Sequence, residues 1–246
     1  MILLVSGEGP TDIGRCDEGA EVCSGADFIA GPMAVLIDKL AETEWRFSPM
    51  DIGAMEFVAE HALSARSREI KPLPKQAVLP GLKGARETGM YFTNARALAH
   101  MAKERADTDK CPVGAVLFRD SDGTNLADAS QREQKLSSIM RGFAAEEFEY
   151  GVAMVPKPKS EAWLMCALQP APYDHCERFE ALPGNDASPH SAKAQFQVML
   201  TAREKDLADL ADLAKDGTIS ATRIVMPSYD EFRNRILEVA RKMQSA

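Results

Sequence analysis

The chain has 246 residues, of which 45% are hydrophobic and 27% charged, and its formal net charge is −8 at pH 7. This length fits one sizeable domain, or one domain with an insertion, and the composition is ordinary for a soluble globular protein. The apolar runs fall short of the roughly 18 residues of a membrane helix, and the acidic balance argues against wholesale attraction to nucleic acid.

The first predicted strand covers residues 2–5 and ends at the breaker cluster Ser6-Gly7-Glu8-Gly9-Pro10. The two glycines allow the backbone to turn tightly around Glu8. A polar loop is expected over residues 15–27. Pro32 then opens a helix, because the apolar residues after it recur at helical spacing.

Residues 46–87 are rich in proline and basic residues, and we interpret them as an insertion of loops and short strands. A helix follows, capped by Thr88 or Thr93 and ending near Arg105. The strand at 113–118 is the clearest buried strand of the chain, since its residues are continuously apolar.

That strand is followed by Asp120-Ser121-Asp122-Gly123. Alternate residues at a strand end can point their carboxylates into one small volume, where a bound cation relieves the repulsion between them. Magnesium prefers such oxygen ligands, from one or two carboxylates with water and substrate phosphate. The alternative is a simple turn, because Asp and Gly are favoured in turns.

A long helix over 126–148 leads to another apolar strand at 150–155, which ends in a Pro-Lys-Pro-Lys run. Ser160 is the predicted N-cap of the next helix. Residues 191–215 are helical in pattern, and a capping box at Ser228-x-x-Glu231 is expected to start the last helix.

Continuous apolar strands alternate with helices, which is typical of an α/β fold with a mainly parallel sheet flanked by helices. We therefore expect an α/β domain over 1–168, with the insertion at about 46–87, and a mainly helical C-terminal extension over 169–246 packed on the same domain. Functional loops of such folds gather at the carboxyl ends of the strands, where Glu8 and the two aspartates are placed.

The five cysteines are odd in number and irregular in spacing, without a Cys-x-x-Cys pair. This pattern argues against a disulfide framework and against a structural zinc site. The N-terminal segment also lacks the basic region and the apolar length of a signal peptide. We expect reduced thiols in a cytoplasmic protein.

Charge is unevenly distributed along the chain. Residues 1–63 hold 3 Lys/Arg and 12 Asp/Glu, residues 64–105 hold 9 and 3, and the rest holds 17 and 22, so the three segments carry −9, +6 and −5. A basic segment in an acidic protein is either a phosphate-contacting surface or a solvated face of a loop and helix, and the sequence leaves both open.

Other known motifs do not fit. Gly7-Glu8-Gly9 begins like a dinucleotide fingerprint, but Asp12 stands where the third glycine belongs. The chain has neither the Gly-Lys-Ser/Thr of a P-loop at this turn nor a Gly-x-Ser-x-Gly elbow.

The motif pair of strand–Glu8-Gly9-x-x-Asp12 and strand–Asp120-x-Asp122 resembles the Toprim domain shared by topoisomerases, primases and the overcoming-lysogenization-defect (OLD) nucleases. The segment from Pro156 to Glu161-Ala-Trp-Leu is similar to a signature of bacterial Toprim-like proteins. The resemblance covers three short motifs within about residues 1–165.

The resemblance implies a Toprim-like, Rossmann-like fold and a site for Mg²⁺ or Mn²⁺. It implies acid/base chemistry for Glu8 and metal ligation by Glu8, Asp120, Asp122 and Glu161. Asp12 is either a further ligand or a helix N-cap.

OLD-type nucleases also place a lysine near the scissile phosphate, where it stabilises developing charge. Lys157 and Lys159 are the candidates for that role, and Lys193 is a further one. Trp163 is expected in the core rather than as a base-stacking residue, since stacking needs an exposed ring.

The function implied by the resemblance is a metal-dependent nuclease that acts on nucleic-acid phosphodiester bonds. By analogy it would serve bacterial phage defence, with an ATPase partner. One alternative is a non-catalytic binding or regulatory subunit. Another is a haloacid-dehalogenase-type phosphatase with Asp120 as nucleophile and Asp122 as acid, although that motif normally opens its domain and the chain lacks a convincing downstream metal motif.

Overall fold

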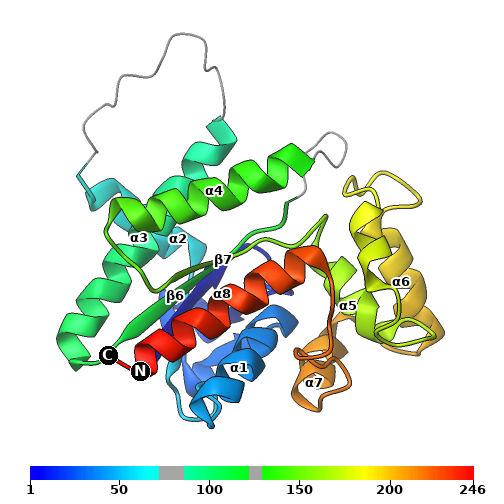
Figure 1. The fold of residues 1–246 in the computed structure, drawn as a ribbon, viewed down its shortest axis with the longest axis horizontal. Helices are drawn as coiled ribbons and strands as arrows, with labels where there is room; N and C mark the ends of the chain where they lie inside the picture. Colours follow the sequence, from blue (N-terminus) through cyan, green and yellow to red (C-terminus); the bar gives the residue numbers. More distant parts are fainter. Residues whose placement is uncertain (72–85, 122–128) are drawn as a thin grey trace.

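The computed structural model describes residues 1–71, 86–121 and 129–246. It shows an α/β fold in which a five-stranded, mostly parallel sheet lies between two layers of helices (Figure 1). The order of strands is β3-β5-β1-β6-β7. The predicted α/β class, the mainly parallel sheet and the helical C-terminal part are thereby confirmed.

Four strands of this sheet run parallel, and the edge strand β3 runs antiparallel to its neighbour. Every residue of the two central strands is buried, as expected for apolar strands covered on both faces. The strands are β1 (Ile2–Gly7), β3 (Val22–Ser24), β5 (Met55–Val58), β6 (Val113–Phe118) and β7 (Gly151–Met154).

The ends of β1 and β6 lie at the same level of the sheet, because Gly7 pairs with Phe118 in their register. A Cβ atom added to Gly7 would lie only 2.8 Å from Cβ of Phe118, so this close approach requires glycine. Glu8 and Asp120 therefore leave the sheet side by side.

Alternate side chains of the strands face the two helix layers. Leu3 and Val116 pack with the first layer, whereas Leu4 and Ala115 pack with the second. The first layer holds α1 (Pro32–Trp45), α5 (Ser160–Leu168) and α8 (Pro227–Gln244), and the second holds α2 (Glu60–Glu69), α3 (Arg86–Asp109) and α4 (Ala129–Ala145). Among the residues described, no helix is long and apolar enough to cross a membrane.

The predicted insertion at 46–87 is, over its described part, built into the central fold. Strand β5 is hydrogen-bonded beside β1, with Leu3 opposite Met55, and α2 follows directly. Residues 72–85 of that segment lie outside the described residues.

The predicted polar loop at 15–27 contains short regular elements instead. Strand β2 (Gly14–Cys16) pairs with β4 (Phe28–Ala30) in a small antiparallel sheet. Two 3₁₀ turns, η1 (Asp17–Gly19) and η2 (Gly25–Asp27), flank β3. The polar composition hid these strands because they are only three residues long.

The expectation of reduced thiols is wrong for four of the cysteines. Cys16 is bonded to Cys23, and Cys166 to Cys176, while Cys111 is free. Each disulfide joins residues of different elements whose proximity depends on the folded chain. Because disulfides are rare in the cytosol, the pairing gives no support to the predicted cytoplasmic location, which stays a prediction.

The elements of the C-terminal part are η3 (Cys176–Ala181), α6 (Ala192–Ala202), η4 (Leu207–Asp209), α7 (Leu210–Lys215) and α8. They pack on α5 and α1: η3 and α6 contact α5, and α7 and α8 contact α1. Residues 191–215 are helical, as the pattern predicts, and form two α-helices with a break after Ala202.

The predicted capping box at Ser228 is wrong. The N-cap of α8 is Met226, and Pro227 occupies its first turn. The Ser228 hydroxyl instead accepts a hydrogen bond from Nε1 of Trp163 at 2.8 Å, and its amide donates to the Glu180 carboxylate at 2.7 Å. Ser228 therefore forms tertiary hydrogen bonds, whereas the local sequence pattern predicts that it caps its own helix.

Candidate functional site at the ends of the central strands

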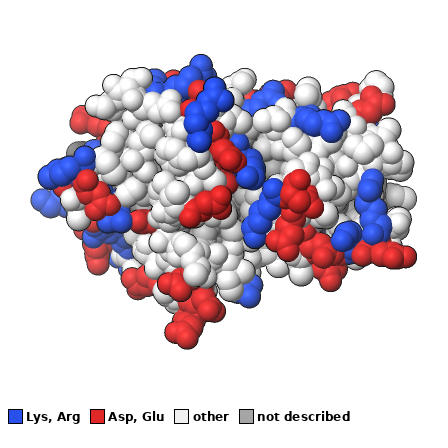
Figure 2. Space-filling model, turned by 90° about the horizontal axis from the view of Figure 1, so that it is seen from below, with Lys and Arg blue, Asp and Glu red and all other residues white. Residues whose placement is uncertain are grey.

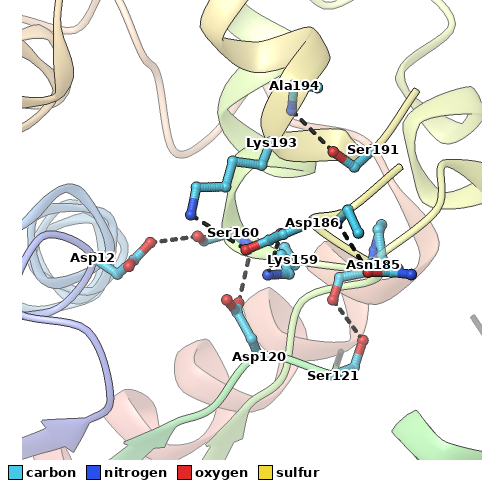
Figure 3. A network of polar contacts seen from close by, with 12 residues as sticks. Asp12, Asp120, Ser121, Lys159, Ser160, Asn185, Asp186, Ser191, Lys193 and Ala194 are labelled. Atoms are coloured by element: carbon cyan, nitrogen blue, oxygen red, sulfur yellow. Dashed lines mark hydrogen bonds and ion pairs between the residues drawn. The ribbon is translucent and has the colours of Figure 1, made fainter. Parts of the chain in front are cut away.

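A chain of hydrogen bonds joins the ends of β1 and β6 to the start of α5. Oε1 of Glu8 accepts from the amide of Asp120 at 2.9 Å, and Oδ1 of Asp120 accepts from the amide of Ser160 at 3.0 Å. The Ser160 hydroxyl donates to Oδ1 of Asp12. Figure 3 shows Asp12, Asp120 and Ser160 meeting from separate elements. We refer to Glu8, Asp12, Asp120 and Glu161 as the carboxylate cluster.

Asp120 points toward α5 because of the alternation along the extended chain. Phe118 belongs to the core on the α5 side, and the fully buried Arg119 forms an ion pair with Glu60 of α2 at 3.0 Å. The next residue returns to the α5 side, where its carboxylate satisfies the first amide of that helix. Ser160 itself is therefore not the N-cap that the sequence predicted; Lys159 is.

Asp12 is held by a tight turn after β1. Its amide donates to the Gly9 carbonyl at 3.0 Å, and Gly9 has a φ of 81°. A Cβ atom on Gly9 would lie 2.6 Å from Oδ2 of Asp12, so glycine makes room for this carboxylate. The N-cap alternative for Asp12 is wrong, since β2 rather than a helix follows it.

Two members of the carboxylate cluster are poorly solvated. Burial raises the pKa of Asp12 above its usual value, against the opposing hydrogen bond from Ser160. Burial also raises the pKa of Glu161, and the charge of Asp12 adds to that rise. Oε2 of Glu161 is shielded from solvent and has no hydrogen-bond partner among the described residues. Two such carboxylates repel each other, which favours a proton or a cation between them.

The candidate lysines have different surroundings. Nζ of Lys159 lies 2.8 Å from Oδ1 of Asp186, and Nζ of Lys193 lies 3.3 Å from Oδ2 of the same carboxylate. The Lys159 hydrogen bond is the main reason that the pKa of Asp186 lies below its usual value. Lys157 is half-buried and forms no ion pair with a described residue.

Two residues that contact this site, Lys135 and Asp186, were not predicted from the sequence. Lys135 of α4 is only 5% exposed, and its ammonium donates to the Asp120 carbonyl at 3.3 Å and lies over the Tyr91 ring, 5.2 Å from its centroid. Asp186 comes from a loop in a Pro-rich stretch. Neither carried a signal, because a lone lysine in a helix and a lone aspartate in a loop are ordinary surface residues in sequence.

Trp163 lies in the core, as predicted. It is 0% exposed, stacks on Phe232 with ring centroids 5.7 Å apart, and meets the edge of Tyr229 at 4.9 Å. A buried ring cannot stack on a base, so this residue anchors α5 and α8 to each other.

The donors of the carboxylate cluster suit Mg²⁺ chemically, because they are hard oxygen ligands. Within residues 1–71, 86–121 and 129–246, however, no three His, Cys, Asp or Glu side chains are placed to hold one metal ion. Asp122, a predicted ligand, lies outside the described residues. The cluster thus provides carboxylates singly or in pairs, which is sufficient for an ion that keeps waters and a substrate phosphate as its other ligands.

Within the described part of the basic segment at 64–105, three arginines form ion pairs with carboxylates. Arg105 pairs with Glu56 at 2.7 Å and Asp109 at 2.9 Å, and Arg66 pairs with Glu69 at 2.9 Å. These contacts favour the reading as a solvated, ion-paired face. On the face of the molecule seen from below, Figure 2 shows basic and acidic side chains interspersed.

A scan against protein-family models, a search of curated proteins and a search of solved structures returned no match. The functional assignment therefore depends on the geometry of the site.

Proposed function

We propose that this protein is a Toprim-type, Mg²⁺- or Mn²⁺-dependent nuclease that hydrolyses phosphodiester bonds. The observation that carries the proposal is the hydrogen-bonded chain from Glu8 through Asp120 and Ser160 to Asp12. It brings the Toprim-like motif residues of two parallel strands together, at the edge of the sheet where α/β proteins place their sites.

In this proposal Asp12 and Glu161, the two carboxylates whose charges repel each other, would hold the metal, with Asp120 beside Asp12 through Ser160 and Asp122 as the ligand expected from the sequence. When bound, the metal polarises the phosphoryl oxygen and lowers the pKa of a water molecule. The chain's own residues orient the site. The Ser160 amide holds one oxygen of Asp120, and the Asp120 amide holds one oxygen of Glu8.

Glu8 is the proposed acid/base group, and Lys159 is the proposed cation near the phosphate. The Glu8 carboxylate is held at Oε1, which limits its rotation while it accepts or returns a proton. A lysine ammonium stabilises negative charge that develops on phosphate oxygens. A place in phage defence beside an ATPase partner is part of the proposal by analogy alone.

The test is cleavage of DNA and RNA, tRNA included, in Mg²⁺, Mn²⁺ or EDTA. Glu8→Gln and Asp120→Asn retain the acceptor oxygens for the two amide hydrogen bonds, so they change charge with little change in structure. We expect a loss of about 100-fold or more from Glu8→Gln, as is typical of general acid–base groups. Asp120→Asn should lower activity as well, because it removes a charge from the proposed metal site. Asp212→Asn is the matched control, because Asp212 is an exposed aspartate of α7. Activity that survives both site substitutions would refute the proposal.

A second candidate is a non-catalytic subunit in which the cluster is structural. It is favoured by the observation that no three-ligand metal group exists among the residues the structure describes and that Glu8 and Asp120 each bind a backbone amide. A tight complex with a partner protein, without hydrolysis in any metal, would establish this candidate over the nuclease.

A further inference from the structure

Asp186 bridges two lysines at the edge of the carboxylate cluster. One of its oxygens contacts Nζ of Lys159 at 2.8 Å, and the other contacts Nζ of Lys193 at 3.3 Å. Figure 3 shows the three side chains converging near Ser160, with Lys193 reaching in from α6. The bridge joins the start of α5 to the segment that follows residue 181, which the Toprim resemblance does not cover.

The loop that carries Asp186 is locally ordered. The Asn185 side chain accepts a hydrogen bond from the Ala187 amide at 3.0 Å, a turn that presents the residue between them. Ser191 caps α6 by accepting from the Ala194 amide at 3.2 Å. Lys193 therefore stands in the first turn of a capped helix, facing the loop.

The three side chains differ in exposure. The Lys159 side chain is 10% exposed, whereas those of Asp186 and Lys193 are 46% and 62% exposed. A buried ammonium needs an anionic or polar partner, but the carboxylate that partners it here reaches in from the solvent side. The Asp186 carboxylate can therefore move away from Lys159 without unfolding any element of the core.

Two ammonium groups on the two oxygens of one anion also suit a phosphate group, which offers several strong acceptor oxygens. The same ammonium groups lie close to the carboxylate cluster, because the charges of Lys159 and Lys193 both act on Asp12. A phosphate bound by the pair would lie beside the proposed metal ligands.

We propose that Lys159 and Lys193 form a phosphate subsite, and that Asp186 occupies this subsite in the substrate-free protein and is displaced when a phosphate group of the substrate binds. The identity of that phosphate as part of a nucleic acid rests on the proposed function; the competition between carboxylate and phosphate does not. The segment after α5, which carries Asp186, then lowers the affinity of the subsite for phosphate by competing for the two lysines.

The experiment measures binding in EDTA, without catalysis, by calorimetry. The probes are inorganic phosphate and a short oligonucleotide, and the proteins are the wild type, Asp186→Asn and Lys193→Ala. Asp212→Asn is the matched control, since Asp212 is also an exposed aspartate in an ion pair, at 3.3 Å from Lys215. Thermal unfolding establishes that each variant is folded.

Removal of an internal competitor raises apparent affinity. We expect Asp186→Asn to bind both probes about fivefold more tightly or better, Lys193→Ala to bind them more weakly, and Asp212→Asn to match the wild type. Unchanged or weaker binding by Asp186→Asn would overturn the proposal, as would an equal gain in Asp212→Asn, which would show a general charge effect.

The two proposals fail separately. Tighter phosphate binding by Asp186→Asn without hydrolysis by any variant would remove the nuclease and leave the subsite. Hydrolysis that depends on Glu8 and Asp120, with no change in phosphate binding on loss of Asp186, would do the reverse. A gain for inorganic phosphate combined with a loss for the oligonucleotide would assign the subsite to a small phosphate compound and overturn its link to nucleic acid.

Discussion

Two acidic side chains of this protein have oxygens that are shielded from solvent, and they differ in how these oxygens are used. Asp38 of α1 is 3% exposed, and its carboxylate accepts from the Ser48 hydroxyl at 2.9 Å and from the Met50 amide at 2.9 Å. Glu161 is also shielded, yet one oxygen has no partner within the described part of the chain and the charge of Asp12 lies nearby. Burial raises the pKa of both groups.

The difference separates a structural carboxylate from one arranged for a ligand. Asp38 replaces its lost water with donors from one loop, so its role ends with holding that loop to α1. Oε2 of Glu161 has lost water without gaining a hydrogen-bond donor among the described residues, and the charge of Asp12 repels the carboxylate. A shielded carboxylate with an unpaired oxygen lowers the stability of the folded protein unless a ligand binds to it. The variants below compare this effect with the stabilising role of Asp38.

The largest effect on stability is expected from Asp38→Ala. This change leaves the Ser48 hydroxyl and the Met50 amide without their acceptor inside the protein. Unsatisfied buried donors cost about 1–3 kcal/mol, so we expect a loss of that size in denaturant unfolding. A loss below about 0.5 kcal/mol, the scatter of ordinary surface substitutions, would mean that Asp38 is not the anchor of this loop.

Glu161→Gln is expected to have the opposite sign. The substitution removes the charge that repels Asp12, and we expect a metal-free gain of about 0.5–2 kcal/mol, the usual range of stabilising substitutions. Mn²⁺ should stabilise the wild type more than the variant, because the metal relieves the same repulsion. A variant that is less stable than the wild type without metal would assign Glu161 a structural role like that of Asp38.

Ser160→Ala should have a smaller effect. It deletes the hydroxyl that donates to Asp12 but retains the amide that holds Asp120. We expect a loss of about 0.5–1.5 kcal/mol in thermal or denaturant unfolding, the net value of one hydrogen bond. Ser121→Ala is the comparison, since it removes a single contact from the Ser121 hydroxyl to the Pro158 carbonyl at 2.9 Å. A much larger loss for Ser160 would show that the cluster is cooperative.

A further prediction concerns how the Glu161→Gln gain changes with pH. A raised pKa in the folded protein means that the folded state holds the proton more tightly than the unfolded state, so stability from this group is present at low pH and lost as pH rises through the raised pKa. The gain of the variant should therefore be largest at neutral and higher pH and shrink as pH falls toward the usual glutamate value. A gain that does not change with pH would exclude charge as its cause.

Part of this site could be predicted from short-range pattern. The apolar runs of β1 and β6 are followed at once by Glu8 and Asp120, and parallel strands bring their carboxyl ends to one edge. No comparable argument was possible for β5, because a strand of four residues carries too little periodicity to be recognised within the segment 46–87. Its place beside β1 depends on pairing across the sheet.

Local propensity was misleading where distant groups compete for the same atoms. Ser228 fits a capping box in sequence, but its hydroxyl accepts a hydrogen bond from Trp163 and its amide donates to Glu180. The cysteine spacing did not predict the two disulfides. The distance between the sulfur atoms depends on how η3 packs on α5 and on how β3 lies beside β2. Asp186 reaches Lys159 across 27 residues of chain.

The sequence by itself determined the α/β alternation, the two buried central strands and the acidic loops that follow them, because these depend on apolar runs and breaker residues a few positions apart. Only the tertiary structure decided which carboxylate oxygens accept hydrogen bonds from backbone amides, which carboxylate has an oxygen without a hydrogen-bond partner among the described residues, and which aspartate bridges the lysines. Those outcomes depend on distances between elements far apart in the chain, and a difference of a few ångströms decides whether a carboxylate is a structural anchor or a candidate ligand.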